Sequence, residues 1–137
     1  MTEQEKLNKE VVLRFNKEVL EDGSIDAIND IIHPDFINHT APGTVRGPQG
    51  IIDFTINILR SALTEINVAI FDQIIEGNKV VTRKTVSGTH VANFMGIPPS
   101  RKIVNINIID IITLKDGQYI EHWSIRDLQD VINKSTN

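Results

Sequence analysis

The spacing of apolar side chains changes near Glu65, and this change limits the folds that the chain can adopt. Before Glu65, apolar residues recur every three to four positions, which is typical of amphipathic helices. After it, apolar and polar residues alternate and β-branched side chains dominate, which is typical of strands. Helices followed by strands predict an α+β fold, and the length of 137 residues predicts one domain, 1–137.

Three helices are predicted in the first half. The first covers residues 4–21 and would end at Asp22-Gly23, because glycine commonly follows the last helical turn. Ser24 is expected to cap a short second helix, which His33-Pro34 would end, since the residue before a proline avoids helical angles. After a loop, Gly47-Pro48 would open the third helix, with proline in its first turn.

Four strands are predicted in the second half, joined as an antiparallel meander. Hairpin turns are expected at Glu76-Gly77-Asn78 and at Lys115-Asp116-Gly117. The strand at 101–114 is apolar on both faces in its second half, so we expect both faces to be covered there. The predicted strands are 66–75, 79–89, 101–114 and 119–127. The expected fold is one curved sheet that cups the three helices.

Charge and composition exclude several classes of function. The net charge is −4 and the basic residues are scattered, so we expect no nucleic-acid partner. Cysteine is absent, which excludes disulfides and thiolate chemistry. No apolar run approaches the roughly 20 residues that span a bilayer, and the charged start of the chain has no apolar leader segment. These features predict a cytoplasmic protein without a membrane partner.

The last predicted strand concentrates the chemically informative residues. Alternation would place Tyr119, Glu121, Trp123 and Asp127 on one face and His122 on the other, unless a bulge intervenes. If the first face lines a cavity, Asp127 is a carboxylate beside apolar walls and is suited to general-base catalysis. Otherwise the segment is an edge strand, and Asp127 is a surface carboxylate that caps the segment after it.

Several short strings, in this order and with these spacings, carry a resemblance to a known family. The strings are Asp35-Phe36-Ile37-Asn38-His39, Arg46-Gly47-Pro48, Gly88-Thr89-His90, Phe94-Met95-Gly96-Ile97-Pro98-Pro99, and Glu121-His122-Trp123 followed by Asp127. With them the chain resembles, over nearly its whole length, the SnoaL-like polyketide cyclases (ester-cyclase branch) of the nuclear transport factor 2-like superfamily. The resemblance implies a cone-shaped barrel, in which a strongly curved antiparallel sheet wraps around three N-terminal helices. It also implies an apolar pocket and a homodimer through the outer sheet face.

The resemblance further implies a chemistry. Characterised cyclases of this family close a ring by intramolecular aldol condensation without a metal, Schiff base or redox cofactor, and an aspartate acts as acid and base. The matching position is Asp127, and His39, His90 and His122 are the histidines that could donate to the enolate oxygen. The chain carries Lys84 where the family often has an aromatic residue. With only 5% aromatic residues, this difference argues against a polyaromatic substrate.

The remaining residues of the predicted site are expected to hold the substrate. The predicted pocket lining consists of Phe36, Phe54, Phe94, Ile97, Tyr119, Glu121, His122 and Trp123. No metal site is expected, because the histidines lie on separate elements without HxH or HExxH spacing.

Three hypotheses about function stay open at this stage. The first is a cofactor-free cyclase or isomerase that abstracts a proton α to a carbonyl in a small, largely apolar substrate. Asp127 would be the base and His39 or His90 would polarise the carbonyl. Aldol cyclisation, double-bond isomerisation and dehydration all fit. The second is a non-catalytic small-molecule binding protein with the same fold, and the third is a dimeric module whose sheet binds protein partners.

Overall fold

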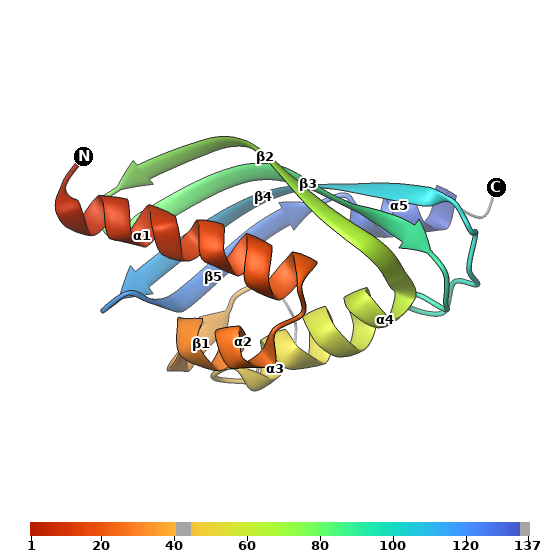
Figure 1. Cartoon of the computed structure of the whole chain (residues 1–137), viewed down its shortest axis with the longest axis horizontal. Coiled ribbons are helices and arrows are strands. Elements are labelled where there is room, and N and C mark those ends of the chain that lie inside the picture. The colour runs from red at the N-terminus through yellow and green to blue at the C-terminus, as the bar shows by residue number, and fades with distance from the viewer. Residues whose placement is uncertain (41–44, 135–137) are drawn as a thin grey trace.

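The computed structural model describes residues 1–40 and 45–134 and consists of a sheet with helices packed on one side (Figure 1). The helical segments are α1 (Glu3–Arg14), η1 (Phe15–Glu21), α2 (Ile25–Ile31), α3 (Gln49–Ile51), η2 (Ile52–Leu59), α4 (Arg60–Ala62) and α5 (Leu128–Lys134). The strands are β1 (Ile32–Asn38), β2 (Leu63–Glu76), β3 (Lys79–His90), β4 (Ile103–Lys115) and β5 (Gln118–Arg126). The predicted α+β class is confirmed.

The first predicted helix is present as α1 continued by η1, a π-helical stretch. Thr2 begins it with a capping box, in which its side chain accepts from the backbone of Glu5 while the Glu5 carboxylate accepts from the Thr2 N–H. Gly23 follows its end with φ of +69°, and the side chain of Arg60 occupies the space where a Cβ would stand. Arg60 also donates to the carbonyls of Leu20 and Glu21, 2.8 and 2.7 Å away, and so satisfies the end of η1.

The sheet is mixed, whereas we expected it to be purely antiparallel. Its strand order is β1-β5-β4-β3-β2, and β1 pairs with β5 in parallel. The helix α2 does end before His33-Pro34, but the predicted loop after it is a strand. Pro34 is compatible with β1 because this strand lies at the sheet edge, where a missing N–H leaves no partner unsatisfied. The predicted antiparallel meander from β2 to β5 and both hairpins are confirmed. The cone shape expected for the sheet stays a prediction.

Several strand ends differ from the prediction by one to three residues. The strand β2 begins at Leu63, and β5 ends at Arg126 rather than at residue 127. The helix α5 was not predicted. It buries Leu128 and Ile132, and it follows Asp127 directly.

The hydrophobic core lies between the helices and the inner face of the sheet. Phe36, Phe94, Ile28, Ile32 and Ile132 are among the largest fully buried side chains. The outer face is less well covered, because Ile109 and Ile111 of β4 are 45% and 36% exposed. The expectation that both faces of this strand are covered is therefore wrong for the single chain. Within the described ranges, no helix is both long and apolar enough to cross a bilayer.

Candidate functional site

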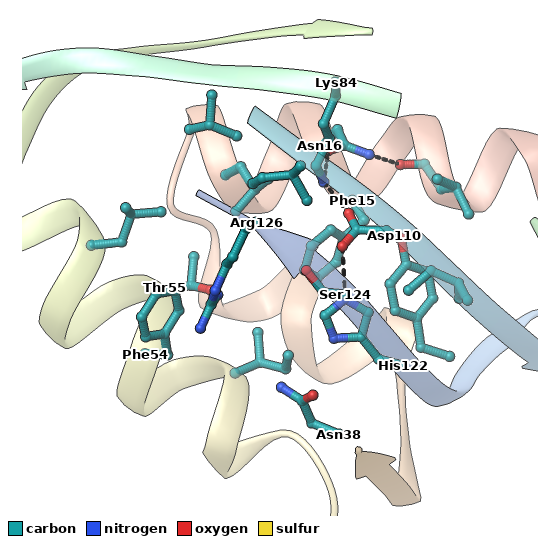
Figure 2. Close-up of a pocket in the computed structure, with 18 of the residues that line it drawn as sticks. Phe15, Asn16, Asn38, Phe54, Thr55, Lys84, Asp110, His122, Ser124 and Arg126 are labelled. Carbon is teal, nitrogen blue, oxygen red and sulfur yellow. Dashed lines mark hydrogen bonds and ion pairs between the residues drawn. The ribbon is translucent and has the colours of Figure 1, made fainter. Parts of the chain in front are cut away.

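A cavity of about 90 Å³ lies between the inner face of the sheet and the helical segments η1 and η2. Most of its wall is apolar, and its aromatic side chains include Phe15, Phe36, Phe54 and Tyr119. Figure 2 shows Lys84, Asn16, Asp110 and His122 gathered on one side of it, with Arg126 and Thr55 on the other and Asn38 below. The polar and charged lining residues are Asn16, Asn38, Thr55, Lys84, Asp110, Tyr119, His122, Ser124 and Arg126. An apolar pocket with a few converging polar groups is the usual form of a small-molecule site.

A buried ionic network crosses this wall. The Asp110 carboxylate contacts Lys84 Nζ at 2.7 Å through one oxygen and His122 Nε2 at 2.9 Å through the other (Figure 2). The side chains of Lys84 and Asp110 are only 4% and 10% exposed. Lys84 also donates to the Asn16 side-chain oxygen at 2.7 Å, and Asn16 donates to the carbonyl of Val12 at 2.8 Å. Each member of the network thus holds its neighbour in one position.

The charge of Asp110 fixes the role of His122. Burial raises the pKa of the Asp110 carboxyl, but the Lys84 ammonium and the hydrogen bond from His122 lower it by more. The net pKa of Asp110 therefore lies well below its ordinary value, and the group is ionised at neutral pH. A carboxylate only accepts hydrogen bonds, so His122 Nε2 must carry the proton in this contact. In neutral imidazole, Nδ1 then presents a lone pair.

The second nitrogen of His122 is left without a partner. His122 Nδ1 is buried, and none of the described residues forms a hydrogen bond with it. In Figure 2 this side of the ring faces the part of the cavity where Asn38 lies. Buried polar atoms in native proteins are usually paired, so an unpaired one in a cavity wall calls for an explanation. An imidazole ring with one nitrogen held by a carboxylate and the other nitrogen free has the arrangement of a general base.

A bulge in β5 turns His122 toward the cavity. Tyr119 pairs with Leu114 and Glu121 with Thr113, so Ile120 is an extra residue between two successive pairs of the ladder. Tyr119 and His122 consequently both face inward. The predicted assignment of faces is corrected: Glu121, Trp123 and Ile125 lie on the outer face, because the bulge reverses the alternation after Tyr119.

Three of the predicted site residues meet on that outer face instead of in the cavity. His39 Nε2 contacts the Glu121 carboxylate at 2.9 Å, and the His39 ring stacks on Trp123 with centroids 4.6 Å apart. The ammonium of Lys79 lies 5.1 Å from the centre of the Trp123 ring, a cation–π contact. None of these four residues lines the cavity.

Three more of the predicted site residues, His90, Phe94 and Ile97, lie at the end of β3 and in the loop after it. They too are outside the cavity lining. His90 is fully buried, and its Nδ1 accepts from the backbone of Ser100 at 3.2 Å. Its Nε2 has no hydrogen-bond partner among the described residues, and its ring meets the edge of Phe94 at 6.2 Å. Phe94 and Ile97 form a bridge in the following loop and pack against the core.

Asp127 also lies outside the cavity. Its two carboxylate oxygens accept from the backbone and the side chain of Asn107, at 2.7 and 2.9 Å. Its carbonyl accepts from the backbone of Val131 at 3.0 Å, which starts α5. The carboxylate thus ties the end of β5 to β4, and it is the backbone carbonyl of Asp127, not its side chain, that accepts from α5.

The cavity contains functional candidates that the sequence reasoning did not select, namely Asp110, Asn16 and Arg126, with Lys84 noted only as a departure from the family. A signal for the ion pair was present. Lys84 follows Val80 and Thr82 on the inward phase of β3, and Asp110 interrupts the inward isoleucines of β4. Opposite charges on the buried faces of neighbouring strands indicate an ion pair. The described residues contain no group of three or more His, Asp or Glu side chains placed to hold a metal ion.

Comparison with known proteins agrees with this architecture. The family model of the SnoaL-like polyketide cyclases matches residues 10–134. A solved structure from Jannaschia sp. CCS1, described as a SnoaL-like polyketide cyclase, has 28% identity and a TM-score of 0.88, covering 99% of this chain and 96% of that one. TsrD from Streptomyces laurentii has 24% identity and a TM-score of 0.85, with 96% of both chains covered.

More distant matches show the fold alone. An LEH-like epoxide hydrolase from M. tuberculosis superimposes with a TM-score of 0.72 at 13% identity, covering 97% of this chain and 91% of that one. The search of curated proteins gave no match. Because the family model covers nearly the whole chain and the structural neighbours share its fold, this protein belongs to the SnoaL-like polyketide cyclase family, with the nuclear transport factor 2-like fold.

Proposed function

We propose that the protein is a cyclase- or isomerase-type enzyme that abstracts a proton α to the carbonyl of a small substrate, with His122 as the base. The observation that carries this proposal is the buried Nδ1 of His122, unpaired within the described residues while Nε2 is held by an ionised Asp110. Family membership supports the reaction class. The aspartate expected in the mechanism is then Asp110, acting through His122, rather than Asp127.

The proton moves in two steps. His122 Nδ1 takes the proton from the substrate carbon, and the resulting imidazolium is stabilised by the Asp110 carboxylate at 2.9 Å. The electron pair of the broken C–H bond moves into an enolate, whose oxygen needs a donor. Tyr119 and Ser124 supply hydroxyl groups in the same wall. Burial, and then the Asp110 carboxylate, raise the pKa of Tyr119 well above its ordinary value, so this hydroxyl keeps its proton. Return of the proton from His122 to another substrate atom completes an isomerisation or follows ring closure.

The cavity limits the substrate. Its volume of about 90 Å³ is smaller than the roughly 150 Å³ of an engineered apolar cavity that accepts benzene. A small aliphatic carbonyl compound is therefore a better fit than an aromatic, and above all a fused polyaromatic, one. The apolar wall, with Phe36 and Phe54, would hold the carbon skeleton, and the polar side of the cavity would face the carbonyl.

Deuterium exchange tests the proposal without knowledge of the natural substrate. Cyclopentanone and 3-methylbutan-2-one would be incubated with the protein in D₂O near pH 7, and loss of the α-proton signals would be followed by NMR. We expect the wild type to accelerate exchange over buffer. We expect His122→Asn to lose most of this acceleration, because a positioned general base contributes about 10²- to 10⁴-fold.

Two control substitutions distinguish catalysis by His122 in the cavity from catalysis by the residues that the sequence predicted, His39 and Asp127. His39→Asn removes a histidine that also contacts a carboxylate, but on the outer face, and Asp127→Asn removes the carboxylate at the end of β5. Both variants should retain wild-type exchange. Full exchange activity in His122→Asn, or its loss in Asp127→Asn with the fold intact, would contradict the proposal. If the wild type binds ketones without accelerating exchange, the chain is a small-molecule binding protein instead.

We also propose that the outer sheet face pairs with that of a second copy. This face presents partly exposed apolar side chains from β2, β4 and β5, among them Phe71, Ile74, Ile103, Ile109 and Ile125, the last 79% exposed. Monomeric proteins rarely expose large contiguous apolar patches, and a homodimer interface is one arrangement that buries such a patch.

A further inference from the structure

Arg126 is a cation at the cavity that has no anionic partner among the described residues. It is the last residue of β5, on the inward side of the strand, and its guanidinium lies 4.7 Å from the centre of the Phe54 ring. Figure 2 shows it extending beside Phe54 and Thr55 of η2. By contrast, Arg14 is paired with Glu18 and Asp30, and Arg83 is paired with Asp72.

The charges of the cavity wall do not cancel. Lys84 and Asp110 neutralise each other at 2.7 Å, and His122 donates to the same carboxylate. Arg126 is the remaining ionised side chain of the lining, so the wall carries one positive charge in excess. A cavity with low-dielectric walls and a single unpaired cation attracts an anion.

Arg126 is an exposed residue whose side chain is only partly withdrawn from water. Burial lowers the pKa of Arg126, and the Asp110 carboxylate raises it by less, so the site disfavours the charge overall. Arginine nevertheless stays protonated at neutral pH. The cation–π contact with Phe54 holds the guanidinium beside the ring without using a hydrogen bond, so its N–H groups stay available to a ligand. The planar fork of donors of a guanidinium matches the two oxygens of a carboxylate.

We propose that Arg126 binds the carboxylate of a small organic acid at the cavity mouth, with the apolar part of the ligand pointing inward toward His122. The substrate class is then a carbonyl compound that carries a carboxylate, rather than a neutral ketone or ester. This orientation rests on the proposed function, but the binding of the acid does not. The neutral apolar wall around Ile106, Ile108 and Phe36 accommodates the carbon skeleton.

The test is a binding comparison between an acid and its neutral amide. Binding of 3-methylbutanoate and 3-methylbutanamide, which have the same carbon skeleton, would be titrated by NMR through the side-chain N–H signal of Arg126 and the backbone signals of the cavity. At pH 7 and low salt we expect the acid to bind about tenfold more tightly, the size of a charge-assisted hydrogen-bond pair partly open to water. Raising the ionic strength should reduce this preference.

Two variants assign the preference to Arg126. In Arg126→Gln, acid and amide should bind with equal affinity, whereas Arg126→Lys should keep part of the preference, since it retains the charge but not the fork of donors. Arg83→Gln, on the outer face, should bind like the wild type. Equal affinity of acid and amide in the wild type, or an undiminished preference in Arg126→Gln, would overturn the proposal. Because no turnover is measured, loss of exchange in the ketone experiment leaves this result unaffected.

Discussion

The ion pair between Lys84 and Asp110 allows a sharp test of how this cavity wall is held together. The perturbation is a pair of single substitutions, Lys84→Met and Asp110→Leu, together with the double variant. Both side chains are at most 10% exposed, so each charge depends on the other rather than on water. Removing one partner leaves an uncompensated buried charge, which typically costs about 3–5 kcal/mol of the free energy of unfolding.

The double variant should be much less affected than the sum of the two single variants. It removes both charges and leaves an apolar pair of similar volume, a replacement that is often neutral. The remaining cost is the orphaned Nε2–H of His122 and the lost donor to Asn16, about 1–3 kcal/mol for an unpaired buried group. The sum of the single effects would be roughly 6–10 kcal/mol, so the coupling energy should be several kcal/mol.

Urea unfolding, followed by circular dichroism, measures the four free energies of this cycle. Asp110→Asn, which keeps the volume of the side chain, replaces Asp110→Leu if the latter does not fold. Additive effects, with the double variant as unstable as the two losses together, would refute the reasoning. They would show that water reaches both groups and that the pair is not closed off from solvent.

The pH dependence of the same pair has a defined sign. The folded pKa of Asp110 lies below its ordinary value of about 3.9, so the unfolded chain takes up this proton first as the pH falls. The stabilisation is fully present at neutral pH and is lost progressively below about pH 4. The stability difference between the wild type and Asp110→Asn should therefore narrow in acid. A difference that stays constant from pH 7 to pH 2.5 would contradict the assignment.

Two further predictions concern Tyr119 and the outer face. The raised pKa of Tyr119 means that the folded chain keeps this proton above pH 10 while the unfolded chain releases it, so stability should fall as the pH rises past 10. Tyr119→Phe should show a shallower alkaline loss in urea titrations, and an unchanged slope would show that the hydroxyl is accessible to water. On the outer face, Ile125→Glu should shift the protein from dimer to monomer in sedimentation velocity, because it puts a charge into the proposed interface. A wild type that already sediments as a monomer would remove the basis for that proposal.

Local signals in the sequence were sufficient for most of the fold. Ser24 as a helix cap, the glycine after η1 and the two hairpin turns each involve residues close in sequence, and the structure confirms them. The strand β1 was missed because its pairing with β5 joins segments about 85 residues apart, and because Pro34 favours a loop when only neighbouring residues are considered. The helix α5 is too short for its apolar spacing to be distinguished from a tail.

The site was harder to predict because it depends on register. The pairing of Lys84 with Ile108 and of Asp110 with Thr82 places the two charges diagonally on one face, but β3 and β4 are joined by a long connection that fixes no register by itself. Tyr119, Phe36 and Phe54 of the predicted lining lie in the cavity wall, and their contact with a substrate stays a prediction. His122 was also in the predicted lining. Simple alternation, however, predicts it on the face opposite to Tyr119, and the bulge at Ile120 places both side chains on the inner face.

The bulge at Ile120 shifts the alternation of β5 by one residue, relative to an uninterrupted strand that starts at the hairpin. One extra residue sets the phase of every position after it, so the imidazole of His122 faces the cavity while the indole of Trp123 faces outward. Among relatives of this chain, loss of this single residue would remove the bulge, while the pairs of His122 with Ile112 and of Trp123 with Ile111 could stay, so the positions after the bulge would keep their faces. Positions on this strand should therefore be compared between proteins by counting back from Arg126, and never by counting forward from the hairpin.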